Sequence, residues 1–136
     1  MSIEAKNATK IAEIAINLAK KEGKEISVSV ADCAGEELCF MTTDSADIQT
    51  RAIAKRKAYT SARTGRNTGE NAKLREKKGQ QLAWFDPNYT GLQGGVVLKS
   101  RHEIVGAIGV SGLQPEEDEA LAQKAFKLWQ KQEKAG

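Results

Sequence analysis

Hydrophobic positions along the chain follow two different periods, and together they predict an order of helices and strands. Apolar residues at three- and four-residue steps predict helices over 3–22 and 47–64, and a shorter polar helix is expected over 68–78. Alternating apolar and polar residues predict two strands on either side of a turn at 32–35. A last helix is expected from Pro115, followed by four acidic residues that suit the positive end of its dipole.

The last third of the chain contains two apolar runs, 94–98 and 104–112, which predict an antiparallel hairpin with a polar turn. The second run contains or ends in Gly106, Gly109 and Gly112. Glycine in a strand has no side chain to pack and loses more backbone entropy on folding than other residues. These glycines therefore indicate a place where a helix, a neighbouring subunit or a ligand lies close to the backbone.

The expected order of elements is helix, two strands, two helices, two strands, helix. This order favours an α+β fold in which helices pack on an antiparallel sheet, because the strand–helix alternation of a doubly wound parallel sheet is absent. The chain has 136 residues and contains no internal repeats or linkers, so we expect a single domain over residues 1–136.

Composition narrows the classes of function. A net charge of +3 and 5% aromatic residues fall short of a dedicated nucleic-acid binder, and no nucleic-acid partner is expected. No apolar run reaches the roughly 18–20 residues that span a bilayer, so no membrane association is expected either. The N-terminus lacks the pattern of a signal peptide, which favours the cytoplasm or a compartment loaded from it. Cys33 and Cys39 match no zinc or redox spacing.

Candidate chemical groups are few. His102 is the only histidine, and its place at a hairpin tip is typical of a solvated side chain, although it could also serve as a single axial ligand to a haem iron. Ser111 lies in a glycine-rich segment that is one residue away from the spacing of a hydrolase nucleophile, and no base is adjacent, so we do not expect it to act as a nucleophile.

The basic helix over 51–63 offers a more specific indication. Lys57 and Thr60 share one side of this helix, close to its alanine-rich face. A solvated basic face would explain the pattern. The more specific alternative is a pocket in which Lys57 or Arg63 pairs with the carboxylates of an anionic ligand. The aromatic residues within 84–89 could wall a flat ligand or close the core.

Five motifs resemble those of one known family. The segment Lys57-Ala58-Tyr59-Thr60-Ser61-Ala62 resembles a Lys-Ala-x-Thr-Ala helix, and Gly94-Gly95-Val96-Val97-Leu98 is similar to a Gly-Gly-Val-Pro-Ile strand. The other motifs lie at 30–35, 105–112 and 117–122. Together they resemble the GlcG/HbpS-like group, the haem-degrading domain family, which also forms the C-terminal domain of PduO-type proteins.

The resemblance implies a profilin-like antiparallel sheet with helices packed on its faces, in the order α-β-β-α-α-β-β-α. It also implies self-association into dimers or octamers and haem as the cofactor. The histidine that PduO-type domains can use near the N-terminus is absent here, so the iron would be held by His102, a hydroxyl, a thiol or water. The residues expected to bind the ligand are Lys57, Thr60, Arg63, Gly94, Gly95 and Ser111.

Three functional hypotheses follow. The leading one is a cytoplasmic, oligomeric protein that binds a tetrapyrrole, namely haem, as an accessory factor of a metabolic operon or a bacterial microcompartment. The first alternative is an enzyme that acts on a small anionic metabolite in a glycine-lined pocket. The second is a structural assembly protein without a ligand. The sequence singles out no catalytic residue.

Overall fold

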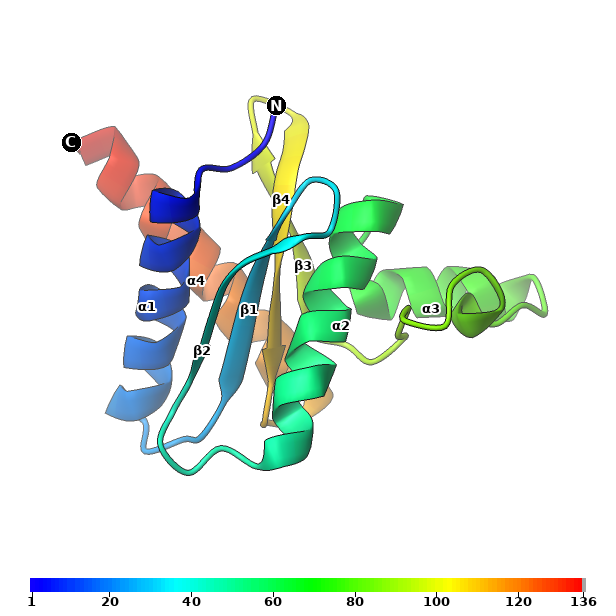
Figure 1. Cartoon of the computed structure of the whole chain (residues 1–136), viewed down its shortest axis with the longest axis horizontal. Coiled ribbons are helices and arrows are strands. Elements are labelled where there is room, and N and C mark those ends of the chain that lie inside the picture. Colours follow the sequence, from blue (N-terminus) through cyan, green and yellow to red (C-terminus); the bar gives the residue numbers. More distant parts are fainter. Residues whose placement is uncertain (136) are drawn as a thin grey trace.

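The computed structural model describes residues 1–135, which form four α-helices and a four-stranded antiparallel sheet (Figure 1). The helices are α1 (Ala5–Lys21), α2 (Ile48–Thr64), α3 (Thr68–Lys77) and α4 (Pro115–Ala135), with a short 3-10 turn, η1 (Leu82–Trp84). The strands are β1 (Ser27–Asp32), β2 (Glu37–Thr42), β3 (Gly95–Ser100) and β4 (Glu103–Ser111). The predicted α+β fold and the predicted order of elements are confirmed.

The strands are ordered β2-β1-β4-β3, so the two hairpins meet along β1 and β4 at the centre of the sheet. Helices α1 and α4 cover one face of the sheet and α2 covers the other, while α3 projects to the side (Figure 1). Within the described residues, no helix has a stretch apolar enough and long enough to cross a bilayer.

At the centre of the sheet, the two faces carry side chains of very different size. Neighbouring residues of a strand point to opposite faces, so each strand contributes one set to each layer. The face toward α1 and α4 carries large apolar residues that belong to the main core: Val28, Val30, Val96, Leu98, Ile108 and Val110. The face toward α2 carries small residues at its centre, on β1, β4 and the start of β3, and larger ones, Phe40 and Val97, only on the edge strands. The small residues are Ser27, Ser29, Ala31, Gly95, Ala107, Gly109 and Ser111.

Helix α2 packs directly against the backbone of this small-residue face. A Cβ atom on Gly109 would lie 2.2 Å from the carbonyl oxygen of Ala54 and 2.6 Å from the amide nitrogen of Ala58. The Ser27 and Thr50 hydroxyls share a hydrogen bond of 2.9 Å across the same interface. The element that approaches Gly109 is therefore a helix of the same chain.

The β3–β4 hairpin closes through a two-residue turn. Ser100 pairs with Glu103, and the two residues between them, Arg101 and His102, have φ values of +52° and +70°. Two consecutive positive φ values are the mark of a type I′ turn, which fits the twist of a hairpin. His102 is exposed at this tip.

Candidate functional site

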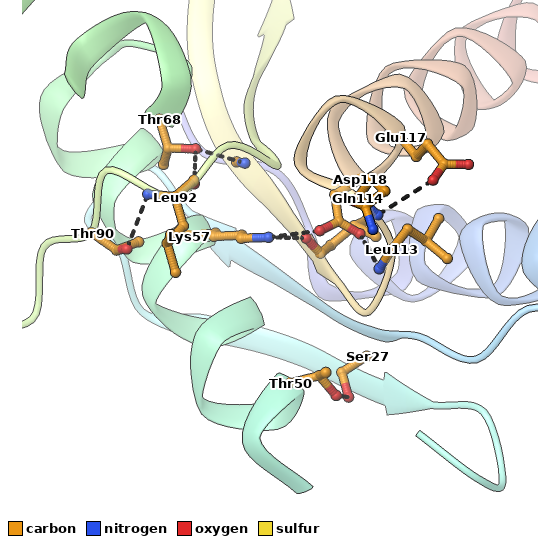
Figure 2. A network of polar contacts seen from close by, with 12 residues as sticks. Ser27, Thr50, Lys57, Thr68, Thr90, Leu92, Leu113, Gln114, Glu117 and Asp118 are labelled. Carbon is orange, nitrogen blue, oxygen red and sulfur yellow. Dashed lines mark hydrogen bonds and ion pairs between the residues drawn. The ribbon is translucent and has the colours of Figure 1, made fainter. Parts of the chain in front are cut away.

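A buried ion pair joins α2 to the start of α4. The Lys57 ammonium donates hydrogen bonds to the Asp118 carboxylate at 3.0 Å and to the Val110 carbonyl at 2.7 Å (Figure 2). The two charged side chains are 3% and 4% exposed. The second carboxylate oxygen of Asp118 accepts a hydrogen bond from the Leu113 amide at 3.0 Å. The pair therefore ties α2, the end of β4 and the first turn of α4 together.

Burial dominates the electrostatics of this pair. It lowers the pKa of Lys57 and raises the pKa of Asp118, and their mutual attraction and hydrogen bond oppose these shifts without cancelling them. Each charge is thus held in the interior by the other. Lys57, which the sequence placed beside an anionic ligand, has a carboxylate of its own chain as its partner.

The glycines at the start of β3 lie against the same part of α2. A Cβ atom on Gly95 would lie 2.6 Å from the Lys57 carbonyl oxygen, and one on Gly94 would lie 2.7 Å from the Lys57 amine. The Gly95 amide donates to the Thr68 hydroxyl at 2.9 Å. Protein atoms thus fill the space between α2 and the start of β3, where Lys57, Gly94 and Gly95 were expected to bind the ligand.

Two further expected ligand residues belong to the same packed interface. Thr60 is fully buried, and its hydroxyl accepts a hydrogen bond from the Thr90 amide at 2.9 Å. Ser111 is 5% exposed and lies opposite Ser27 across the β1–β4 pair. Of the six residues that the sequence proposed, only Arg63 is exposed.

Arg63 belongs to a cluster near the C-terminal end of α2. Its guanidinium carbon lies 5.1 Å from the centre of the Tyr59 ring, and the Tyr59 hydroxyl donates a hydrogen bond of 2.5 Å to Asp86. The rings of Tyr59 and Tyr89 are 5.7 Å apart between centroids. The hydrogen bond from Tyr59 is the main cause that lowers the pKa of Asp86, and the same bond raises the pKa of Tyr59.

Beside this cluster a cavity of about 240 Å³ opens between β1, the β1–β2 turn and α2. Its floor is part of the small-residue face, and exposed cations from α2 stand at its edge. The Ser29 hydroxyl donates to the Glu37 carboxylate at 2.8 Å within it. The lining residues are Ser29, Ala31, Gly35, Glu37, Lys55, Arg56, Tyr59 and Asn88.

Sequence reasoning missed this cavity, although two signals pointed to it. The alternation of Ser27, Ser29 and Ala31 with large residues marks a strand face that leaves room above it. Lys55 and Arg56 lie on α2 outside the alanine-rich face that the sequence favoured. No local pattern brings Asn88 to the same place.

Metal-ligating side chains are scattered over the structure. Among residues 1–135, no three His, Cys, Asp or Glu side chains come together as a metal-binding group. His102 lies at the hairpin tip and is not part of the cavity lining. Cys39 packs against the core that α1 and α4 cover.

Comparison with known proteins finds one family and several solved structures that are similar to this chain. The model of the family described as "Haem degrading protein HbpS-like" matches residues 3–127. The chain is similar to a double mutant of HbpS from Streptomyces reticuli, with 29% identity, a TM-score of 0.86, and coverage of 94% of this chain and 87% of that one.

Two further solved structures share the fold. The protein ORFY of Klebsiella pneumoniae has 25% identity and a TM-score of 0.86, over 94% of this chain and 90% of that one. A PduOC–haem complex has 21% identity and a TM-score of 0.83, over 93% of this chain and 94% of that one. No curated protein matches the sequence.

Proposed function

Because the chain belongs to the HbpS-like family of haem-degrading proteins, we propose that it binds haem and acts as a haem-handling accessory protein. The family match extends over residues 3–127, and similarity to HbpS covers 94% of the chain. The PduOC structure, described as a haem complex, supports the proposal in a further way: this fold is compatible with a bound tetrapyrrole.

The cavity between β1, the β1–β2 turn and α2 is the site that we propose for the ligand. The observation that carries this assignment is a floor of small residues, Ser29 and Ala31, beside the exposed cations Lys55 and Arg56. A flat ring needs a surface free of large side chains. Carboxylate groups at its edge form strong charge-assisted hydrogen bonds with lysine and especially arginine. Arg63, next to Tyr59, adds a third cation nearby.

The small and basic residues of the cavity suit the ring and the carboxylates of haem in chemical character, and the lining limits the ligands for its iron. When bound, haem supplies a redox-active iron whose properties depend on its axial ligand. The side chains at the cavity that could act as ligands provide oxygen, from Tyr59 and Glu37, and the Tyr59 hydroxyl is already bonded to Asp86. We therefore propose an oxygen ligand, from one of these residues or from water, rather than His102.

Self-association is part of the same proposal. A haem ring is larger than a cavity of about 240 Å³, so one chain would leave part of the ring exposed. A second copy placed over the cavity would cover it, in line with the dimers or octamers that the family resemblance implies. Light scattering at micromolar concentration should therefore give a mass above that of one chain. A monomer both with and without haemin would contradict this part.

A role in the cytoplasm, in a metabolic operon or within a microcompartment completes the proposal. Neighbouring genes that encode shell proteins, glycolate oxidase or diol dehydratase would support it. Neighbours without any link to such metabolism would count against it.

Titration with haemin tests the main proposal. We expect a saturable change in the Soret band with a fixed stoichiometry per chain. Iron-free protoporphyrin retains the ring and the carboxylates, so its binding measures their contribution without that of the iron. His102→Ala should leave the position of the Soret maximum unchanged, because the imidazole lies outside the cavity lining. Absence of saturation with haemin would overturn the proposal.

A second candidate function rests on the size of the cavity. A volume of about 240 Å³ with Lys55, Arg56 and Glu37 at its edge is suited to a small anionic metabolite. Under this alternative, small carboxylates would raise the melting temperature and Arg56→Ala would abolish the increase, while haemin would not bind. The glycine pattern that suggested subunit packing is already used within the chain, where Gly109 faces α2.

A further inference from the structure

Two hollows lie along the outer surface of α4, on the opposite side of the sheet from the proposed ligand cavity. One, of about 360 Å³, lies between the end of α1, Leu113 and the first turns of α4. The other, of about 340 Å³, continues along α4 as far as Lys131. They share Ala120 and Lys124, so they form one continuous surface, which we call the α4 groove.

The floor of the α4 groove is apolar. It consists of Leu18, Leu113, Ala120, Leu121 and Leu128. Leu121 is 6% exposed and anchors the floor in the core, whereas Leu18, Leu113 and Leu128 are only half-buried. Apolar side chains that are half-buried along a hollow retain hydrophobic surface that a second molecule could cover.

The rim of the α4 groove is basic. Its lysines are Lys21, Lys24, Lys124, Lys127 and Lys131. Its carboxylates are Glu22 and Glu117, and Glu117 is already paired with Lys24 at 3.0 Å. The charged residues that line the second hollow are all lysines. The groove therefore complements a partner that is negatively charged.

The shape of the groove favours an elongated partner. From Glu117 to Lys131 the groove follows α4 over 15 residues, or about 21 Å at the rise of an α-helix. Its α4 residues recur at three- and four-residue steps, so they lie along one side of that helix and form a continuous strip on which a second helix could lie. A small molecule would occupy one hollow and leave the other empty.

We propose that the α4 groove docks an acidic amphipathic helix of a partner protein. Leucine-type side chains of that helix would cover the floor, and its carboxylates would face Lys124, Lys127 and Lys131. The proposal is independent of haem binding, since the groove and the ligand cavity lie on opposite faces of the sheet.

The probe for this proposal is a labelled synthetic peptide of about 20 residues, long enough to form a helix. In this peptide, leucines lie at three- and four-residue steps on one face of the helix, and glutamates lie on the other face. We expect saturable binding by fluorescence anisotropy that weakens as salt is added. A peptide of the same composition with scrambled leucine positions serves as the control and should not bind. No saturation with the patterned peptide, or equal binding of the scrambled one, would overturn the proposal.

Paired charge reversals locate the site. Lys124→Glu combined with Lys127→Glu should weaken binding by about tenfold or more, which corresponds to about 1.4 kcal/mol or more. Lys73→Glu combined with Lys77→Glu makes the same charge change on exposed positions of α3 and should have no such effect. Equal weakening by both pairs would show a nonspecific charge effect and overturn the assignment.

NMR spectra of the wild-type protein locate the bound peptide independently of the variants. Peptide-induced NMR shifts should concentrate on α4 and on the end of α1. Shifts concentrated on α2 or α3 would refute the site. The alternative occupants are also testable: an oligomer that dissociates on Lys124→Glu with Lys127→Glu would assign the groove to a second copy. Binding to anionic vesicles without binding to the peptide would assign it to a lipid surface.

Discussion

The Lys57 ammonium lies 3.0 Å from the Asp118 carboxylate in the interior of the protein. The two residues come from α2 and α4, helices that cover opposite faces of the sheet, and they meet beyond the end of β4. Removing either charge leaves the other without a partner in a site that water does not reach. Each charge therefore needs the other, and removing one of them is more destabilising than replacing both.

Single neutralisations of this pair should be strongly destabilising. Lys57→Met and Asp118→Asn should each lower the free energy of unfolding by about 3–5 kcal/mol, because each leaves one buried charge alone. The double variant should recover much of this loss, since it buries no charge, and its asparagine oxygen can still accept the Leu113 amide hydrogen bond. Urea unfolding of the four proteins gives the coupling energy. A double variant that loses the sum of both single effects would contradict this account.

Substitutions of Gly109 test the close approach of α2. Gly109→Val should cost on the order of 2–4 kcal/mol, because its Cβ would collide with main-chain atoms of Ala54 and Ala58. Gly109→Ala should cost less than valine but still be destabilising. Gly69→Ala is the matched control in α3: its Cβ would meet only the flexible side chain of Gln93, at 3.0 Å. Equal melting temperatures for the Gly109 and Gly69 alanine variants would show that the contact with α2 is unimportant.

The Tyr59–Asp86 hydrogen bond should make stability depend on pH in a defined window. The pKa of Asp86 is lowered from 3.8, so the bond stabilises the fold above pH 3.8, and this contribution is lost as the pH falls through the lower folded value. The pKa of Tyr59 is raised from 10.0, so the contribution is complete below pH 10.0 and is lost at higher pH as the phenol ionises in the folded protein.

Tyr59→Phe isolates this contribution. The difference in melting temperature between wild type and Tyr59→Phe should be largest between these limits and should shrink at both ends. Thermal unfolding followed by circular dichroism across pH measures it. A difference that is constant across the whole range would assign the effect of the substitution to packing of the ring instead.

Arg56→Ala should weaken haemin binding while leaving the fold intact. The side chain is exposed at the edge of the proposed ligand cavity, so its loss removes one charge-assisted contact without exposing the core. Such a contact is typically worth about 1.5–3 kcal/mol, or roughly ten- to a hundredfold in affinity. Lys73→Ala on α3 is the control for loss of one positive charge. Equal haemin affinities for Arg56→Ala and Lys73→Ala would remove Arg56 from the site.

The order of elements was predictable because periodicity is a local property of the chain. The steps in the apolar residues of α1 and the alternation in β1 depend only on neighbouring positions, and both are visible in the printed sequence. The glycines of β4 were also informative. They indicated a close approach, and the structure identifies α2 as the element that approaches Gly109.

The candidate site was harder to predict because its parts come from distant segments. Lys57 shares one side of α2 with Thr60, so its sequence context resembles that of a cation beside a ligand. Its partner, Asp118, looks like one of several acidic residues at a helix start. Nothing local connects two residues that are 61 positions apart. The ligand cavity likewise needs Asn88 and Glu37 to be brought to α2 by the fold.

Because the central residues of the two sheet faces differ in size, the two faces should differ in how many amino-acid substitutions they tolerate. Toward α1 and α4, side chains of similar volume can exchange, since Val, Ile and Leu repack at a cost of less than about 1.5 kcal/mol. Toward α2, a single added methyl group at Gly109 meets main-chain atoms, which no neighbouring side-chain change can move aside. A saturation library of this chain should therefore tolerate many exchanges among its largest core residues and almost none at its smallest. As homologous sequences diverge, the positions with the smallest side chains should therefore change least.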